Sequence, residues 1–207
     1  STKNIEVETV WGVCDEDLFA QVLREAGKSH ASGKLFFNYV FNTSNHRPYI
    51  YPEGKIDIPP LSGRLGGVKY ADFSIGEFIA AAKKKPWFNN TLFVFVADHG
   101  AGSAGKHDLT PENHHIPFIL YAPKILTPKR VDKAISQIDV IPTMLGVLNF
   151  SYHSPYYGFD ALKDSFDSRY FIANYQQVAM MKDGILTVLL PKRKFEFYKD
   201  GKIYNKL

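Results

Sequence analysis

Four of the seven histidines gather within seventeen residues, and an aspartate stands directly before the first of them. The cluster contains Asp98-His99, then His107, His114 and His115. Carboxylate oxygen and imidazole nitrogen are ligands well suited to zinc or manganese. The spacing therefore indicates a divalent-metal site, although a surface loop can collect histidines by chance and an Asp-His pair can simply end a strand.

Two short apolar runs border this cluster and predict buried strands. Residues 91–97 (TLFVFVA) end at Asp98, and residues 116–122 (IPFILYA) begin directly after His115. We therefore expect Asp98, His99 and His115 to converge on one rim of a sheet.

His46 is the fourth candidate in the predicted site. A third apolar run, residues 35–41 (LFFNYVF), predicts another buried strand, and its polar exit leads to His46. A parallel arrangement would bring His46 to the rim that holds Asp98, His99 and His115. We expect these four side chains to share one cleft, and the alternative is that His46 only satisfies a turn hydrogen bond.

Four motifs along the chain carry a resemblance to a known family. The motifs are residues 45–49 (NHRPY), 96–100 (VADHG), 115–117 (HIP) and 137–143 (QIDVIPT). In these motifs the sequence resembles the sulfatase branch of the alkaline phosphatase superfamily, and more narrowly the lipoteichoic-acid-synthase-like proteins, which transfer phosphoglycerol outside bacterial cells. The resemblance covers nearly the whole chain.

The resemblance implies a three-layer α/β/α sandwich and a metal-dependent reaction. A threonine or serine nucleophile, activated by a divalent metal, would take a phosphoryl or sulfuryl group. Asp98 and His99 match two metal ligands of the family, with manganese or zinc as the expected ion and magnesium as a further option. His46 matches a histidine that faces the substrate, and His115 matches one that binds a second metal or the substrate.

The expected partner is an anionic phospholipid or glycan. Arg47 and Lys106 lie near the motifs and could help to hold an anion, although an exposed salt bridge is an equal alternative for either. The chain has 25 basic and 21 acidic residues, a net charge of +4. So slight an excess predicts an ordinary solvated surface and no nucleic-acid partner.

The nucleophile is the largest departure from the family pattern. The family's nucleophile and its first acidic metal ligand lie in the N-terminal half of the catalytic domain, and nothing in this chain matches them. Thr43, Ser44 and Ser103 are hydroxyls near the predicted rim, but none stands at the matching position. We therefore interpret the chain as the C-terminal half of a catalytic domain, which needs the missing N-terminal half and which we expect to be inactive alone.

The remaining elements complete an α/β fold with a largely parallel sheet. Helices are predicted from Asp15 to about Gly27, on one apolar face from Val68 to Ala82, and around Pro142 within residues 135–150. The many prolines and glycines at residues 52–67 interrupt regular secondary structure and predict a long loop. Short apolar runs with turns at Asp183-Gly184 and Asp200-Gly201 predict a small C-terminal antiparallel sheet. We expect two domains, residues 1–160 and residues 161–207.

Composition leaves the cellular location open, and the resemblance supplies an expectation. Cys14 is the only cysteine, so no internal disulfide can form. No apolar run approaches the roughly 20 residues of a membrane span. The resemblance implies a membrane-anchored parent in the bacterial cell envelope, with this domain periplasmic or extracellular. The alternatives are a sulfatase, or a metal-free domain that binds an anionic glycan or a partner chain.

Overall fold

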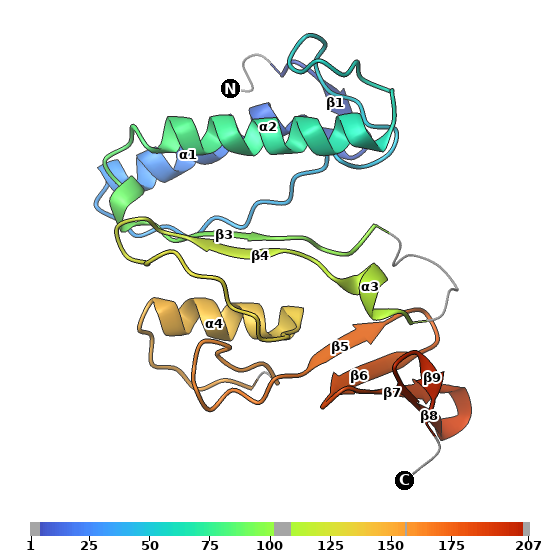
Figure 1. The fold of residues 1–207 in the computed structure, drawn as a ribbon. Helices are drawn as coiled ribbons and strands as arrows, with labels where there is room; N and C mark the ends of the chain where they lie inside the picture. Colours follow the sequence, from blue (N-terminus) through green and yellow to red (C-terminus); the bar gives the residue numbers. More distant parts are fainter. Residues whose placement is uncertain (1–4, 102–108, 156, 205–207) are drawn as a thin grey trace. The chain divides into compact units, whose positions relative to one another are not determined.

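The computed structural model describes residues 5–101, 109–155 and 157–204, which divide into two compact units, Ser1–Thr91 and Leu92–Leu207 (Figure 1). The predicted domains, residues 1–160 and 161–207, stay a prediction. Within the described ranges, no helix is both long and apolar enough to cross a membrane. The first unit contains, in chain order, β1 (Glu8–Thr9), β2 (Gly12–Val13), α1 (Asp15–Ala31), α2 (Arg64–Ala82) and the 3-10 turn η1 (Phe88–Asn90).

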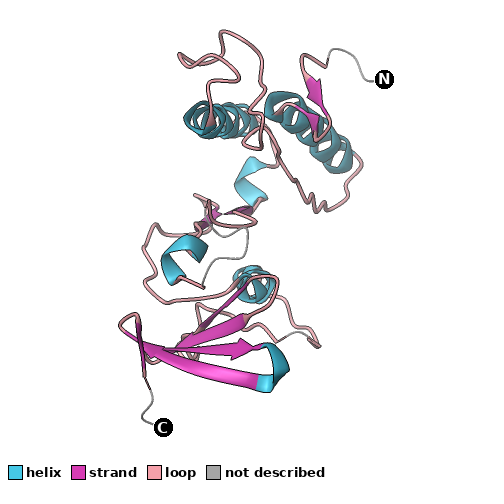
Figure 2. Ribbon diagram, turned by 90° about the vertical axis from the view of Figure 1, so that its right-hand side faces the viewer, coloured by secondary structure: helices cyan, strands magenta, loops and turns pink. Residues whose placement is uncertain are grey.

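Helix α1 begins where the sequence predicts. Its first turn holds three acidic residues, whose charge suits the positive end of a helix. The helix continues past Gly27, its predicted end, and stops before Gly33, whose φ of 72° suits a glycine after a helix. Helices α1 and α2 lie side by side, with Phe19 and Phe78 stacked between them at 4.9 Å (Figures 1 and 2).

Helix α2 confirms the predicted helix at residues 68–82, but it begins earlier, and its buried face coincides only partly with the predicted one. Tyr70 is fully buried, whereas Val68, on the predicted apolar face, is 43% exposed. Gly66, which we expected in the long loop, belongs to the first turns of α2. A Cβ at Gly66 would lie only 2.2 Å from the Tyr51 hydroxyl, and Tyr51 stacks on Tyr70 at 4.7 Å. The absent side chain therefore allows the loop to pack on the helix.

The predicted buried strand at residues 35–41 is wrong for this chain. These residues form no strand, and Leu35, Phe37 and Tyr39 are 94%, 73% and 80% exposed. An apolar run is suited to a strand, but a strand also needs a hydrogen-bonding neighbour, and no described strand pairs with this segment.

The second unit contains two sheets and one well-formed helix. Strands β3 (Phe93–Val96) and β4 (Phe118–Tyr121) pair antiparallel, and α4 (Val140–Val147) has Pro142 in its first turn, as predicted. All strand pairs among the described residues are antiparallel, so the expectation of a largely parallel sheet is wrong here. The other short elements are α3 (Pro111–His114) and the 3-10 turns η2 (Gln137–Asp139) and η3 (Pro191–Arg193).

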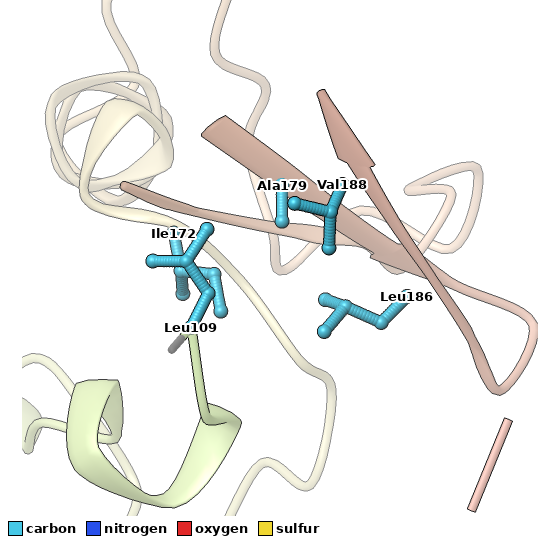
Figure 3. Close-up of a cluster of buried hydrophobic side chains, with 5 residues drawn as sticks. All are labelled: Leu109, Ile172, Ala179, Leu186 and Val188. Atoms are coloured by element: carbon cyan, nitrogen blue, oxygen red, sulfur yellow. The ribbon is translucent and has the colours of Figure 1, made fainter. Parts of the chain in front are cut away.

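The C-terminal antiparallel sheet is confirmed. Its strands lie in sequence order, and the Asp183-Gly184 and Asp200-Gly201 turns have the positive φ angles that such hairpins require. One face of the sheet packs around a small apolar core that contains Leu109, Ile172, Ala179, Leu186 and Val188 (Figure 3). The strands are β5 (Tyr170–Ala173), β6 (Val178–Lys182), β7 (Ile185–Leu190), β8 (Lys194–Lys199) and β9 (Lys202–Ile203).

Candidate metal and substrate site

Asp98 and His99 lie two and three residues beyond the end of β3 (Val96), and their side chains are close to each other. The His99 Nε2 atom is 3.6 Å from Asp98 Oδ2, and the His99 backbone N–H donates to Asp98 Oδ1 at 2.9 Å. His99 Nδ1 lies 2.8 Å from the Gly100 carbonyl oxygen. A carbonyl can only accept, so Nδ1 carries the proton and Nε2 of the neutral ring keeps its lone pair. Both side chains are more than half exposed and accessible to a ligand.

The register of β3 and β4 places His115 at the same end of this strand pair. Val96 lies opposite Phe118, so the residues after β3 and those before β4 leave the pair together. The antiparallel pairing produces this proximity, because in a parallel pair the start of the second strand would lie at the other end.

The two neighbouring histidines differ in their accessibility. His114 Nδ1 donates to the Thr110 carbonyl oxygen at 2.8 Å inside α3, and its Nε2 atom is buried without a hydrogen-bond partner among the described residues. His115 is exposed. Of the two, His115 is therefore the one whose ring can reach a substrate or a metal.

Gln137 supports the Asp98 backbone, a role that residue types and spacing did not reveal. Its side-chain amide donates to the carbonyl oxygens of Ala97 and Asp98 at 3.0 and 2.7 Å. In the sequence, the only indication of a functional role for Gln137 was its place in the QIDVIPT motif, which is far from Asp98 along the chain. The contact fixes the path of the backbone that carries Asp98 and His99.

A buried ion pair holds the η2 turn that contains Gln137. Asp139 is fully buried and accepts two hydrogen bonds from Arg169, at 2.7 and 2.9 Å, and further bonds from the Ser136 and Phe159 backbone N–H groups. Burial by itself raises the pKa of Asp139, but the bonds from Arg169 and from the two backbone groups outweigh it, so the pKa lies below its ordinary value.

His46 lies in the first unit, in a loop that a buried carboxylate anchors. Asp15, the first residue of α1, accepts hydrogen bonds from the Asn42 side chain at 2.8 Å and from the Thr43 and Ser44 backbone N–H groups at 3.2 and 3.0 Å. The Asp15 backbone N–H in turn donates to the Ser44 hydroxyl at 3.0 Å. These bonds fix the chain two residues before His46.

The His46 ring packs against Trp11. Their ring centroids are 3.9 Å apart, and both residues line a shallow hollow beside Cys14 and Thr43. His46 Nδ1 lies 2.8 Å from the Arg47 carbonyl oxygen and therefore carries its proton, which leaves Nε2 free to accept a proton or bind a ligand.

The predicted site residues are therefore distributed over two units. Asp98, His99 and His115 lie in the second unit, at one end of the β3–β4 pair, and His46 and Arg47 lie in the first. That all of them share one cleft stays a prediction. Lys106 lies outside the described residues, as do His107 and Ser103.

The donor set beside β3 fits a divalent metal chemically. The Asp98 carboxylate and the His99 imidazole, through Nε2, are ligands for zinc or manganese. The Nδ1–H bond from His99 to a carbonyl oxygen orients the ring and makes Nε2 a better ligand. Within the described ranges, no three His, Cys, Asp or Glu side chains stand close enough to form a complete metal site. Further ligands must therefore come from elsewhere if these residues bind a metal.

Comparison with known proteins identifies the family. The sulfatase family model matches residues 1–150, so the chain belongs to the sulfatase family. Lipoteichoic acid synthase-like YvgJ of Bacillus subtilis is 26% identical over 163 residues, which cover 68% of this chain and 26% of that protein. An arylsulfatase of Clostridium perfringens is 29% identical over 114 residues, which cover 50% of this chain and 23% of that protein.

Solved structures confirm the fold class. A Vibrio parahaemolyticus protein of the alkaline phosphatase superfamily is 29% identical, with a TM-score of 0.90 over 100% of this chain and 52% of that one. The lipoteichoic acid synthase LtaP of Listeria monocytogenes is 21% identical, with a TM-score of 0.72 over 98% of this chain and 56% of that one. The chain thus has the α/β fold of this superfamily and spans about half the length of these structures.

Proposed function

We propose that this chain is part of a metal-dependent enzyme that transfers or hydrolyses phosphate esters, with phosphoglycerol or a related head group as substrate. The observation that carries the proposal is the position of Asp98, His99 and His115 at one end of the β3–β4 pair. The similarity to the lipoteichoic acid synthase-like YvgJ supports the choice of a phosphate ester.

Each candidate residue has a defined part in this proposal. Asp98 and His99 would hold the metal, which supplies Lewis-acid stabilisation of the charge that develops on the ester. Gln137 keeps the backbone of Asp98 in place. The residues proposed to bind the anionic substrate are His46, Arg47, Lys106 and His115.

A sulfatase is the second candidate function. The family model and the similarity to the Clostridium perfringens arylsulfatase favour a sulfate ester. The two reactions would share the same type of metal site and differ in the nucleophile, which we expect to lie outside this chain.

The proposal extends to partners and location. The remaining metal ligand and the nucleophile would come from an N-terminal half of the same protein, and the substrate would be an anionic phospholipid or glycan. We place the parent protein at the outer face of a bacterial membrane, anchored there and with this domain periplasmic or extracellular. These assignments follow the lipoteichoic-acid-synthase resemblance.

Activity of a longer protein that includes the N-terminal half tests the proposal. We expect turnover of a nitrophenyl phosphodiester with manganese or zinc, little turnover of a nitrophenyl sulfate, and loss of activity with His99→Ala. His153→Ala, an exposed histidine of the same unit, is the matched control and should keep full activity. Preference for the sulfate would favour the sulfatase, and activity unaffected by chelators or His99→Ala would overturn the metal site.

A further inference from the structure

The sheet of β5–β9 leaves an apolar face uncovered. Its opposite face packs on the core of Figure 3, and strand side chains alternate between faces. On the uncovered face, Val178, Leu189 and Phe195 lie directly opposite one another in β6, β7 and β8. They are 50%, 54% and 62% exposed, and we call them the exposed stripe. A contiguous exposed apolar patch of this kind is a candidate interaction surface.

Basic residues stand at both ends of β8, the strand that carries Phe195. At one end, η3 connects β7 to β8 and presents exposed Lys192 and Arg193. At the other end, Lys199 and Lys202 lie opposite each other in β8 and β9, and the register places them on the same face as Phe195. Among the described residues, Lys192, Arg193 and Lys202 form no ion pair.

We propose that this face docks on an anionic lipid surface. An apolar and aromatic centre between cationic ends is the arrangement that binds at a membrane interface, where the rings enter the headgroup layer and the cations meet lipid phosphates. The last sixteen residues contain six Lys and Arg against two acidic residues, which complements a negative surface. A second copy of the chain would bring the same positive charge, so self-association through this face is disfavoured.

This inference goes beyond the proposed reaction and is independent of the metal. It assigns the C-terminal sheet the task of holding the domain at the membrane surface. Vesicle binding can therefore fail while the enzymatic proposal holds, and the reverse is equally measurable.

Vesicle sedimentation of the 207-residue chain tests the docking surface. We expect binding to vesicles of equal parts phosphatidylglycerol and phosphatidylcholine, little binding to phosphatidylcholine alone, and weaker binding as salt rises. The double variant Lys192→Gln/Arg193→Gln should lower the affinity roughly fivefold for each charge removed. The matched control Lys83→Gln/Lys84→Gln removes the same charge from exposed residues beyond α2 and should bind almost as the parent does.

Further variants test whether the apolar side chains of the exposed stripe contribute to vesicle binding. Phe195→Ser should reduce binding at every salt concentration, whereas Leu65→Ser, at an exposed apolar position on α2, should not. Leu189→Gln serves as a second variant if circular dichroism shows that Phe195→Ser is unfolded. Equal losses of affinity in Lys192→Gln/Arg193→Gln and in its control Lys83→Gln/Lys84→Gln, or equal binding to both vesicle types, would overturn the proposal. So would a dimer in sedimentation equilibrium that Leu189→Gln dissociates, because a second copy would then cover the face.

Discussion

Asp15 and Asp139 are both fully buried, one in each unit; Asp15 holds the loop that carries His46, and Asp139 holds the turn that carries Gln137. Neutral donors surround Asp15: one side-chain amide and two backbone N–H groups of the segment before His46. Asp139 also receives two backbone N–H groups, but its main partner is the guanidinium of Arg169. A buried carboxylate can thus be satisfied by neutral donors alone or by a cation as well. Mutations at the two sites should therefore lower the stability of the chain by different amounts.

The location of the two carboxylates explains how the partners differ. Asp15 is the first residue of α1, where the positive end of the helix favours a negative charge. Asp139 is the last residue of η2, directly before α4, and Arg169, directly before β5, reaches it. Arg169 itself stacks on Phe159, Phe166 and Phe171, so its charge is shielded from water on several sides. Both carboxylates join segments 27 to 30 residues apart in the sequence, and the two sites differ in the charge of the partner.

Arg169→Met should give the largest effect on stability. It leaves the Asp139 carboxylate buried without its cation, and breaking a buried pair in this way costs about 3–5 kcal/mol. Urea unfolding of the 207-residue chain would measure the loss. Arg130→Met, which breaks an exposed pair with Asp132, is the matched control and should change little. Similar losses from both variants would show that the burial of Asp139 does not matter.

Acidification should weaken the same contact, by less than Arg169→Met does, because protonation removes the buried negative charge instead of leaving it unpaired. The pKa of folded Asp139 is lowered, so the stabilisation is present above about pH 3.9, the ordinary value for an aspartate, and is lost as the pH falls through the folded pKa. Urea unfolding below pH 4 should therefore show a steeper loss for the parent chain than for Asp139→Asn. Parallel pH profiles would contradict the lowered pKa.

Asp15→Asn should cost less than Arg169→Met, about 1–3 kcal/mol, because it turns one acceptor into a donor among groups that are themselves donors. The backbone amides of Thr43 and Ser44 should also exchange faster with deuterium. Asp72→Asn, at an exposed position on α2, is the control for the loss of one negative charge. Unchanged exchange at Thr43 and Ser44 would show that other contacts hold the loop.

Gln137→Ala should have the smallest effect on stability, about 0.5–1.5 kcal/mol, because the Ala97 and Asp98 carbonyl groups are exposed enough to bond to water instead. Its local effect should be larger, since the backbone of Asp98 and His99 loses its fixed support. Broadened NMR signals of His99, absent in the exposed-glutamine control Gln176→Ala, would show this. Unbroadened signals would mean that the β3 end is rigid without Gln137.

Local patterns in the sequence predicted much of this fold. The acidic first turn located the start of α1, and the Asp-Gly pairs located two hairpins of the C-terminal sheet, because each depends on a few adjacent residues. Pro142 likewise fixed the first turn of α4. The roles of Asp98, His99, His46 and His115 remain predictions from motif and resemblance.

Contacts between distant segments were the part that the sequence did not reveal. The run at residues 35–41 has strand character, but no local pattern states whether a neighbouring strand is present. The antiparallel direction of β3 and β4 depends on a long connection, and strand composition is the same for either direction. Asp15 and Asp139 resemble ordinary surface aspartates until their partners are known. Strand formation at residues 35–41, the direction of β3 and β4, and the burial of the two aspartates all depend on partners that are distant in the sequence, so local patterns could not predict them.

The last prediction concerns catalytic activity instead of stability. The 207-residue chain should not turn over phosphate or sulfate esters, so His99→Ala should leave its activity unchanged at zero. The buried Ser44 hydroxyl already accepts the Asp15 backbone N–H, and we expect the family's nucleophile to lie outside these residues. Assays of a nitrophenyl phosphodiester and a nitrophenyl sulfate with manganese or zinc, beside a longer protein, would measure this. Metal-dependent turnover by the chain at the rate of the longer protein, abolished by His99→Ala, would place the nucleophile within these residues.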